Sequence, residues 1–196
     1  MEGNHTDSYV INSELLDVKN RLESTESEFD LLKLVKDIGE SELLLIGELI
    51  QIYCTADALC RGLIAMLKAY REGLTSDFAY RLNDSDVLIH TKKEAEKTGL
   101  NIDKPGIALA IETLEMHRVF RHTFSHWVVK KYFTGKYLIA FTKSKTDAEK
   151  RDGAILNSGK AKMMIFRISD LKIELEKIKD HCKFLAELHR YLESNL

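Results

Sequence analysis

Residues 41–70 constrain the fold of this chain more than any other segment. Apolar side chains recur there at spacings of three and four, as on an amphipathic helix, but they cover more than one stripe of its surface. A helix with so broad an apolar surface is buried on several sides. We therefore expect it to run through the middle of a helical bundle, with Gly73 just beyond its end.

Helices are predicted on the N-terminal side of this segment and directly after it. Residues 10–38 carry apolar side chains at spacings of three and four, which predicts one or two amphipathic helices ending at Gly39. Residues 83–86 are typical of a turn or helix cap and precede a short polar helix through Lys97. We expect this short helix to lie at the rim of the bundle.

Two further helices are predicted toward the C-terminus. Asp103 and Pro105 together indicate a helix start, which predicts a helix from there to about Phe133. A last helix over residues 169–195 carries an apolar seam at alternating spacings of four and three: Leu171, Leu175, Ile178, Cys182, Leu185, His189 and Leu192. This seam suits packing on another helix, either in the same chain or in a second subunit.

The segment 136–168 changes from helical to alternating periodicity. Apolar side chains occupy every second position in residues 137–141 and again in residues 164–168, as expected for two strands with one apolar face each. We predict a β-hairpin whose connection, residues 143–160, is long and polar, which is typical of a mobile or functional loop. The fold class expected is mainly α, a helical bundle with a small β-hairpin before the C-terminal helix.

Composition predicts a single intracellular domain over residues 1–196. The chain is 44% hydrophobic and 31% charged with one proline, which is typical of a globular helical protein. The richest apolar run, residues 43–52, is interrupted by Gly47, Glu48 and Gln51, and residues 1–10 do not resemble a signal peptide. We therefore expect a cytoplasmic protein that does not enter a membrane. Three cysteines without a C-x2-C pair indicate neither disulfides nor a zinc knuckle.

Positive charge is concentrated in one stretch of the chain. Residues 117–167 carry 12 Lys and Arg against 3 Asp and Glu, a net charge of +9, whereas residues 1–116 have a net charge of -10. Such a local concentration can attract a polyanion that the total charge of -2 does not reveal. A solvated lysine-rich face is the alternative interpretation.

The densest group of polar side chains lies in residues 117–127, within the helix predicted from Asp103. On a helical wheel its aromatic side chains fall on one face, and the opposite arc contains Arg118, Arg121, His122, Ser125 and His126. Arginine offers a fixed fork of donors to phosphate oxygens, and histidine exchanges protons near neutral pH. The pattern thus favours phosphate chemistry without a metal or other cofactor.

Other interpretations of the same residues remain open. An ordinary surface with Arg and His side chains would have the same composition. His122 and His126 are also spaced to share a zinc ion, but Thr123 stands where a metalloprotease helix has glutamate, and no third ligand is evident. No G-x-S-x-G sequence marks a nucleophilic serine, and no phosphate-binding glycine loop is present.

The stretch Arg121-His122-Thr123-Phe124-Ser125-His126 resembles the Arg-x4-6-His motif of the HEPN superfamily. RNase members of that family carry the motif on a late helix of an all-α bundle, often with a polar residue after the arginine, the position of His122 here. The resemblance covers this motif and a compatible helical layout over residues 40–133. It implies a metal-independent endoribonuclease that leaves 2',3'-cyclic phosphate ends.

The resemblance also implies roles for individual residues. His126 would be the general acid or base, Arg121 would stabilise the charged phosphorane, and His122 would support them. The side chains expected to hold RNA are Arg118, Ser125, Lys130 and Lys131. The resemblance further implies a homodimer with two motifs facing one cleft, and a role as a toxin or antiviral-defence component with an antitoxin or defence partner.

One departure from the family pattern concerns that partner. Some toxin members carry a tyrosine two residues after the motif histidine, where an antitoxin modifies it, but this chain has Val128 there. Neutralisation by that route is not expected. The alternative functions are a non-catalytic helical module that binds RNA or an acidic protein, and a scaffold that assembles through the C-terminal seam.

Overall fold

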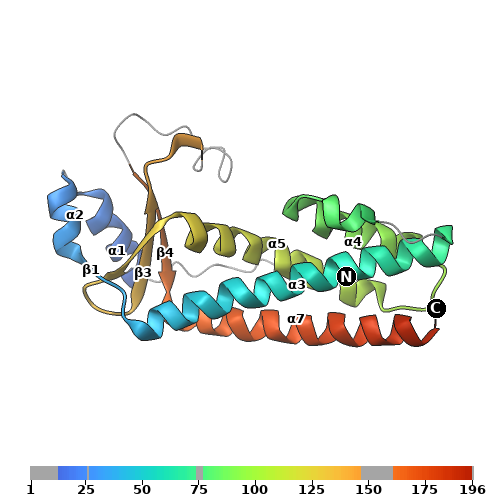
Figure 1. Ribbon diagram of the computed structural model, residues 1–196. Helices are drawn as coiled ribbons and strands as arrows, with labels where there is room; N and C mark the ends of the chain where they lie inside the picture. Colours follow the sequence, from blue (N-terminus) through green and yellow to red (C-terminus); the bar gives the residue numbers. More distant parts are fainter. Residues whose placement is uncertain (1–12, 26, 74–76, 147–160, 196) are drawn as a thin grey trace, which may run out of the picture.

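The computed structural model describes residues 13–25, 27–73, 77–146 and 161–195 and is mainly helical (Figure 1). The helices are α1 (Ser13–Glu23), α2 (Glu28–Leu34), α3 (Glu40–Glu72), α4 (Asp84–Lys97), α5 (Lys104–His126) and α7 (Ile168–Asn195), with a short 3-10 helix, η1 (Asp77–Arg81). The strands are β1 (Val35–Lys36), β2 (Val128–Tyr132), β3 (Tyr137–Thr142) and β4 (Lys162–Arg167). The expectation of a mainly α protein with a small β element is confirmed.

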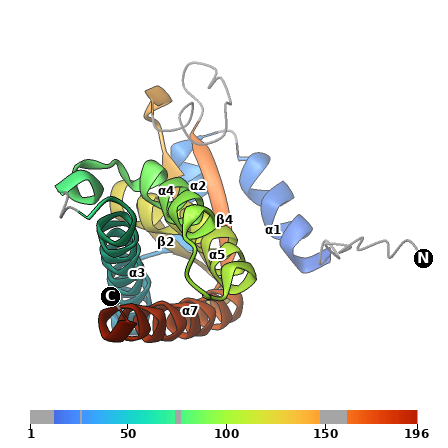
Figure 2. The same cartoon turned by 90° about the vertical axis from the view of Figure 1, so that its right-hand side faces the viewer.

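Helix α3 is the central element, as its broad apolar surface predicts. Figure 2, which looks along the bundle, shows α3, α7 and the α4–α5 pair arranged around a common centre. Gly73 adopts a left-handed conformation (φ 69°) directly after α3 and ends it, as expected.

Among the described residues, α3 is the one helix whose length and apolar composition would suffice to cross a membrane, and a core helix of a soluble protein has the same properties. The interruptions at Gly47, Glu48 and Gln51 do not prevent this, which corrects the expectation that no segment is apolar enough.

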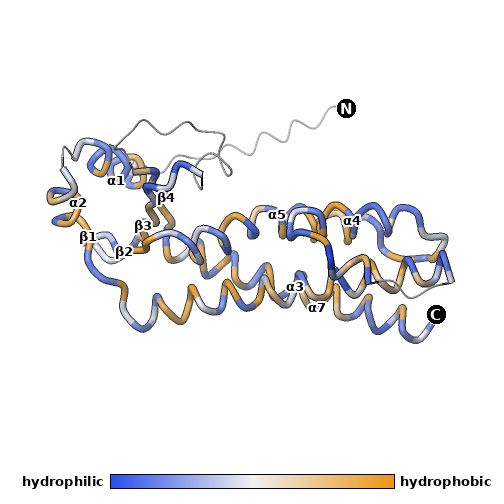
Figure 3. The backbone as a smooth tube through the Cα atoms, turned by 45° about the horizontal axis from the view of Figure 1, so that its top comes forward, coloured by the Kyte–Doolittle hydropathy of each residue, from blue (hydrophilic) through white to orange (hydrophobic). Residues whose placement is uncertain are grey.

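Helices α3 and α7 lie side by side and run in the same direction. The Cys182 thiol donates to the carbonyl of Ile52 at 3.6 Å, and farther along, Gly62 lies so close to His189 that a Cβ on the glycine would be 2.2 Å from the imidazole Nε2. Apolar positions recur along both helices (Figure 3). The seam of α7 is therefore used within the chain: His189 is half-buried against Gly62 as part of it, and the neighbouring Leu188 is buried as well.

The strands form one antiparallel sheet in the order β1-β2-β3-β4, so the expected hairpin is present and larger than predicted. Strand β2 was not foreseen: α5 was expected to reach Phe133 but ends at His126. Val128 to Lys131 pair in register with Phe141 to Leu138 of β3. The β-branched and aromatic side chains of β2 favour a strand over a helix where a partner strand is available. Of the polar connection 143–160, residues 147–160 lie outside the described residues.

The sheet separates two apolar clusters. The alternation predicted for β3 is confirmed, because Leu138 and Ala140 join the main core while Tyr137 and Ile139 face a second cluster with α1 and α2. Figure 1 shows α1 and α2 on the side of the sheet away from the long helices. Burial on both faces makes β3 the rigid centre of this end of the molecule.

One buried carboxylate joins the start of α3 to β2. Glu42 accepts hydrogen bonds from the Gly39 amide (2.8 Å), the Ser41 hydroxyl (3.0 Å) and the Lys131 ammonium (2.6 Å). The bond from Lys131 is the largest cause that lowers the pKa of Glu42 to about 2; the other two donors act in the same direction and burial opposes them. The charged form of Glu42 therefore stabilises the folded state.

We expect Glu42→Gln to lower the free energy of unfolding at pH 7 by about 1 to 2 kcal/mol, because it weakens three hydrogen bonds to one carboxylate. The pKa of Glu42 is depressed on folding, from 4.5 to about 2, so the difference from wild type should be full above pH 4.5 and vanish toward pH 2. Urea unfolding across this pH range measures it. Glu40→Gln, in the same helical turn, is the control, and an equal loss in that variant would contradict the assignment.

Candidate functional site

The C-terminal half of α5 is held on the sheet by aromatic contacts. Phe120 and Phe124 pack against Phe166 of β4, with ring centroids 5.5 and 4.9 Å apart. Asp103 caps the start of the helix as expected, accepting from the amide of Gly106 at 2.9 Å. The helix thus has a fixed start and a docked end, which determines the direction in which its polar face points.

That polar face contains the residues expected from the sequence. Arg118, Arg121 and His122 are half-buried, whereas Ser125 and His126 are exposed. The imidazoles of His122 and His126 stack with centroids 6.0 Å apart and an interplanar angle of 23°. The structure therefore brings Arg121, His122 and His126 together on one partly exposed face, opposite the buried aromatic side chains.

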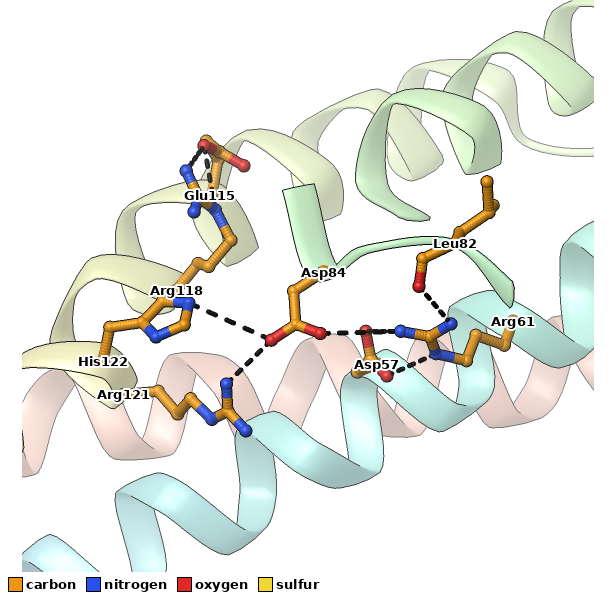
Figure 4. Close-up of polar contacts among 8 residues, drawn as sticks. All are labelled: Asp57, Arg61, Leu82, Asp84, Glu115, Arg118, Arg121 and His122. Atoms are coloured by element: carbon orange, nitrogen blue, oxygen red, sulfur yellow. Dashed lines mark hydrogen bonds and ion pairs between the residues drawn. The ribbon is translucent and has the colours of Figure 1, made fainter. Parts of the chain in front are cut away.

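Asp84 binds the arginine of this group. Its Oδ2 accepts a hydrogen bond from Arg121 Nη1 at 2.7 Å and lies 3.9 Å from His122 Nε2 (Figure 4). Asp84 is the first residue of α4, after the N-cap residue Asn83, where the amide groups of a helix start favour a negative charge. The carboxylate is therefore placed by α4, and it orients a guanidinium that belongs to α5.

A second arginine approaches Asp84 from α3. Arg61 Nη2 lies 3.6 Å from Asp84 Oδ1, and Arg61 is itself fixed by Asp57 at 2.7 Å. Its Nη1 also donates to the carbonyls of Ala79 (2.8 Å) and Leu82 (3.0 Å). Asp84 thus lies between two guanidinium groups, and the side chains come from three helices. We call Asp57, Arg61, Asp84, Arg121 and His122 the polar network.

The other basic residues expected to hold RNA each contact a carboxylate. Arg118 donates to Glu115 on the preceding turn of α5. Lys130 and Lys131 lie on β2, not on a helix, and pair with Asp37 and Glu42. RNA would therefore have to compete with these acidic side chains for the three cations.

His117 belongs to the core and not to the site. Its side chain is fully buried, and its Nε2 lies 3.0 Å from Glu174 of α7. Burial is the largest effect and lowers the pKa of His117, against the opposing influence of Glu174, so the imidazole is neutral near pH 7. Its contact with Glu174 joins α5 to α7.

The acidic half of the polar network was missed by sequence reasoning. Asp84 is 37 residues from Arg121, and residues 83–86 carried only the signal of a turn or cap. Asp57 and Arg61 are spaced for an ion pair within one helix, a signal that was present but does not by itself indicate a site. The contact between them and α5 depends on how three helices pack.

The zinc interpretation of His122 and His126 finds no additional support, because no three His, Cys, Asp or Glu side chains in the described ranges are grouped to hold a metal. A cavity of about 240 Å³ lies elsewhere, between α1 and β4, and contains none of the residues of the polar network.

Comparisons with family models, with curated proteins and with solved structures found no significant match.

We expect Asp84→Asn to release the Arg121 side chain, because the amide has lost the charge that holds the guanidinium. NMR relaxation of the Arg121 Nε–H group should show increased motion, and stability should fall by about 1 to 2 kcal/mol, since a partly exposed pair contributes less than a buried one. Asp86→Asn, in the same turn of α4, controls for the charge at the helix start. An Arg121 side chain that stays ordered in the Asp84 variant would contradict this assignment.

Proposed function

We propose that this protein is a metal-independent endoribonuclease of the HEPN type. The observation that carries the proposal is the grouping of Arg121, His122 and His126 on one partly exposed face, with Arg121 oriented by Asp84 at 2.7 Å. An oriented guanidinium on the same helix face as the exposed imidazole of His126 meets the basic requirement for cleaving a phosphodiester by internal attack. The HEPN-like motif supports the same reaction.

In this reaction the RNA 2'-hydroxyl oxygen bonds to the adjacent phosphorus while the bond from phosphorus to the 5'-oxygen breaks. A base removes the proton of the 2'-hydroxyl, and an acid returns a proton to the leaving 5'-oxygen. We assign His126 to proton transfer, Arg121 to the charge that develops on the phosphorane oxygens, and His122 to supporting His126 through their stacked rings. The products are a 2',3'-cyclic phosphate and a 5'-hydroxyl.

One protomer presents a single Arg121–His126 motif, so we place two motifs across a shared cleft in a homodimer. Such a dimer would supply one histidine as base and the other as acid. Arg118, Ser125, Lys130 and Lys131 would contact the RNA backbone, with affinity that falls as salt rises. We place the activity in the cytoplasm, as part of a toxin or antiviral-defence system.

We expect Arg121→Ala and His126→Ala each to reduce RNA cleavage at least 100-fold while leaving the circular dichroism spectrum unchanged, because both side chains lie on the partly exposed face of α5. Purified proteins would be incubated with total RNA in EDTA and the product ends analysed. Arg81→Ala is the matched control, since Arg81 is 81% exposed and lies on η1. Full activity of both motif variants would refute the assignment.

The alternative is a non-catalytic helical module that binds RNA or an acidic partner. Arg118, Arg121, Lys130 and Lys131 are all paired with carboxylates, so RNA would have to compete with these pairs in the binding module as well as in the nuclease. Intact RNA after incubation with wild type, together with salt-sensitive RNA binding, would establish this alternative in place of the nuclease.

A further inference from the structure

Tyr53 of α3 is a buried residue whose hydroxyl group has no partner. The side chain belongs to a residue that is 2% exposed, and its Oη makes no hydrogen bond with any residue in the described part of the chain. Buried tyrosine hydroxyl groups are normally hydrogen-bonded, because an unpaired one loses its contacts with water and gains nothing in return. The ring alone could be supplied by phenylalanine, so packing does not explain the hydroxyl.

The position of Tyr53 links it to the polar network. Tyr53, Asp57 and Arg61 are spaced four residues apart, which places them on one face of α3. Asp57 and Arg61 are connected through Asp84 to Arg121, and Figure 4 shows Arg121 extending from α5 toward α3. Arg121 has an unpaired buried atom of its own, Nε, which makes no hydrogen bond with the described residues.

The charges that affect the Tyr53 hydroxyl belong to the polar network or to its neighbour Arg118. Burial is the largest cause that raises the pKa of Tyr53; the charges of Asp57 and Asp84 raise it further, and Arg118 opposes them. The hydroxyl therefore stays protonated at every pH at which the protein works. It can act as a hydrogen-bond donor and not as a base.

We propose that Tyr53 is a positioning residue for the Arg121–His126 site, whose hydroxyl donates to the Asp84 carboxylate when a phosphate draws Arg121 away. This inference rests on the proposed nuclease function. In the free protein Arg121 Nη1 donates a hydrogen bond to Asp84, and a phosphorane would compete with Asp84 for the same guanidinium. The Tyr53 O–H then replaces the weakened bond and keeps Asp84 in place between Arg61 and Arg121.

The hydrogen bond from Tyr53 to Asp84 is absent in the free protein and forms in the transition state. Only an interaction that is stronger in the transition state than in the ground state accelerates the chemical step. An unpaired buried hydroxyl that gains a partner during the reaction meets that condition. The same hydroxyl is a cost to the stability of the free protein.

The test is Tyr53→Phe, which removes the hydroxyl and keeps the ring. We expect kcat to fall about 10-fold, which corresponds to the loss of one hydrogen bond in the transition state, with KM changed less than two-fold. The melting temperature should stay the same or rise, because the variant no longer buries an unpaired hydroxyl. The substrate is total RNA, followed by a labelled oligonucleotide that contains a mapped cleavage site.

A control variant and a double variant test whether Tyr53 acts through Asp84. Tyr132→Phe is the matched control, because Tyr132 is also 2% exposed but lies in the cluster beneath α1 and α2. If Tyr53 acts through Asp84, the double variant Tyr53→Phe, Asp84→Asn should be no slower than the more impaired single variant. Independent effects would instead multiply.

Three results would overturn the role of Tyr53. They are a wild-type kcat in Tyr53→Phe, multiplied effects in the double variant, and a loss of activity that parallels a loss of stability. If Arg121→Ala and His126→Ala are still inactive in that case, the nuclease function stands without it. If wild type leaves RNA intact, both proposals fail together.

Discussion

The packing of α3 against α7 is the contact on which the rest of the structure depends. The approach at Gly62 and His189 brings the two helices close together along a parallel path, which leaves the remaining surface of α3 to α4 and α5. Because α3 is buried from several sides, the positions of Asp57 and Arg61 on it are fixed by the core and not by local preference. Every distance in the polar network follows from that placement.

The polar network shows how a helical core accommodates charge. Two carboxylates and two guanidinium groups alternate from Asp57 to Arg121, and Arg61 is satisfied by a carboxylate and two backbone carbonyls. Partly buried charges are tolerated only when each has an opposite neighbour and its hydrogen bonds are made. The unpaired atoms at its margin, Tyr53 Oη and Arg121 Nε, are therefore exceptions that call for a functional explanation.

Sequence patterns predicted the elements that depend on local chemistry. The cap at Asp103, the end of α3 at Gly73 and the alternating faces of β3 all follow from spacing and residue type. The end of α5 was misplaced because the helical period continues past His126, and only pairing with β3 turns those residues into a strand. The shared face of Arg121, His122 and His126 was accessible from spacing. Asp84 could not be identified from spacing, since its contact with Arg121 joins two helices far apart in sequence. Tyr53 occupies one of the apolar positions of α3, and its spacing does not distinguish it from the others.

The junction between α5 and β2 has a mechanical consequence. Only Trp127, which is buried and whose amide donates to Thr123, stands between His126 and the first residue of the sheet. The exposed imidazole is thus attached to a rigid corner and not to a loop that could absorb displacement. Because Arg121 lies on the same helix, a displacement of the sheet would move His126 and Arg121 together and would leave the spacing between them unchanged.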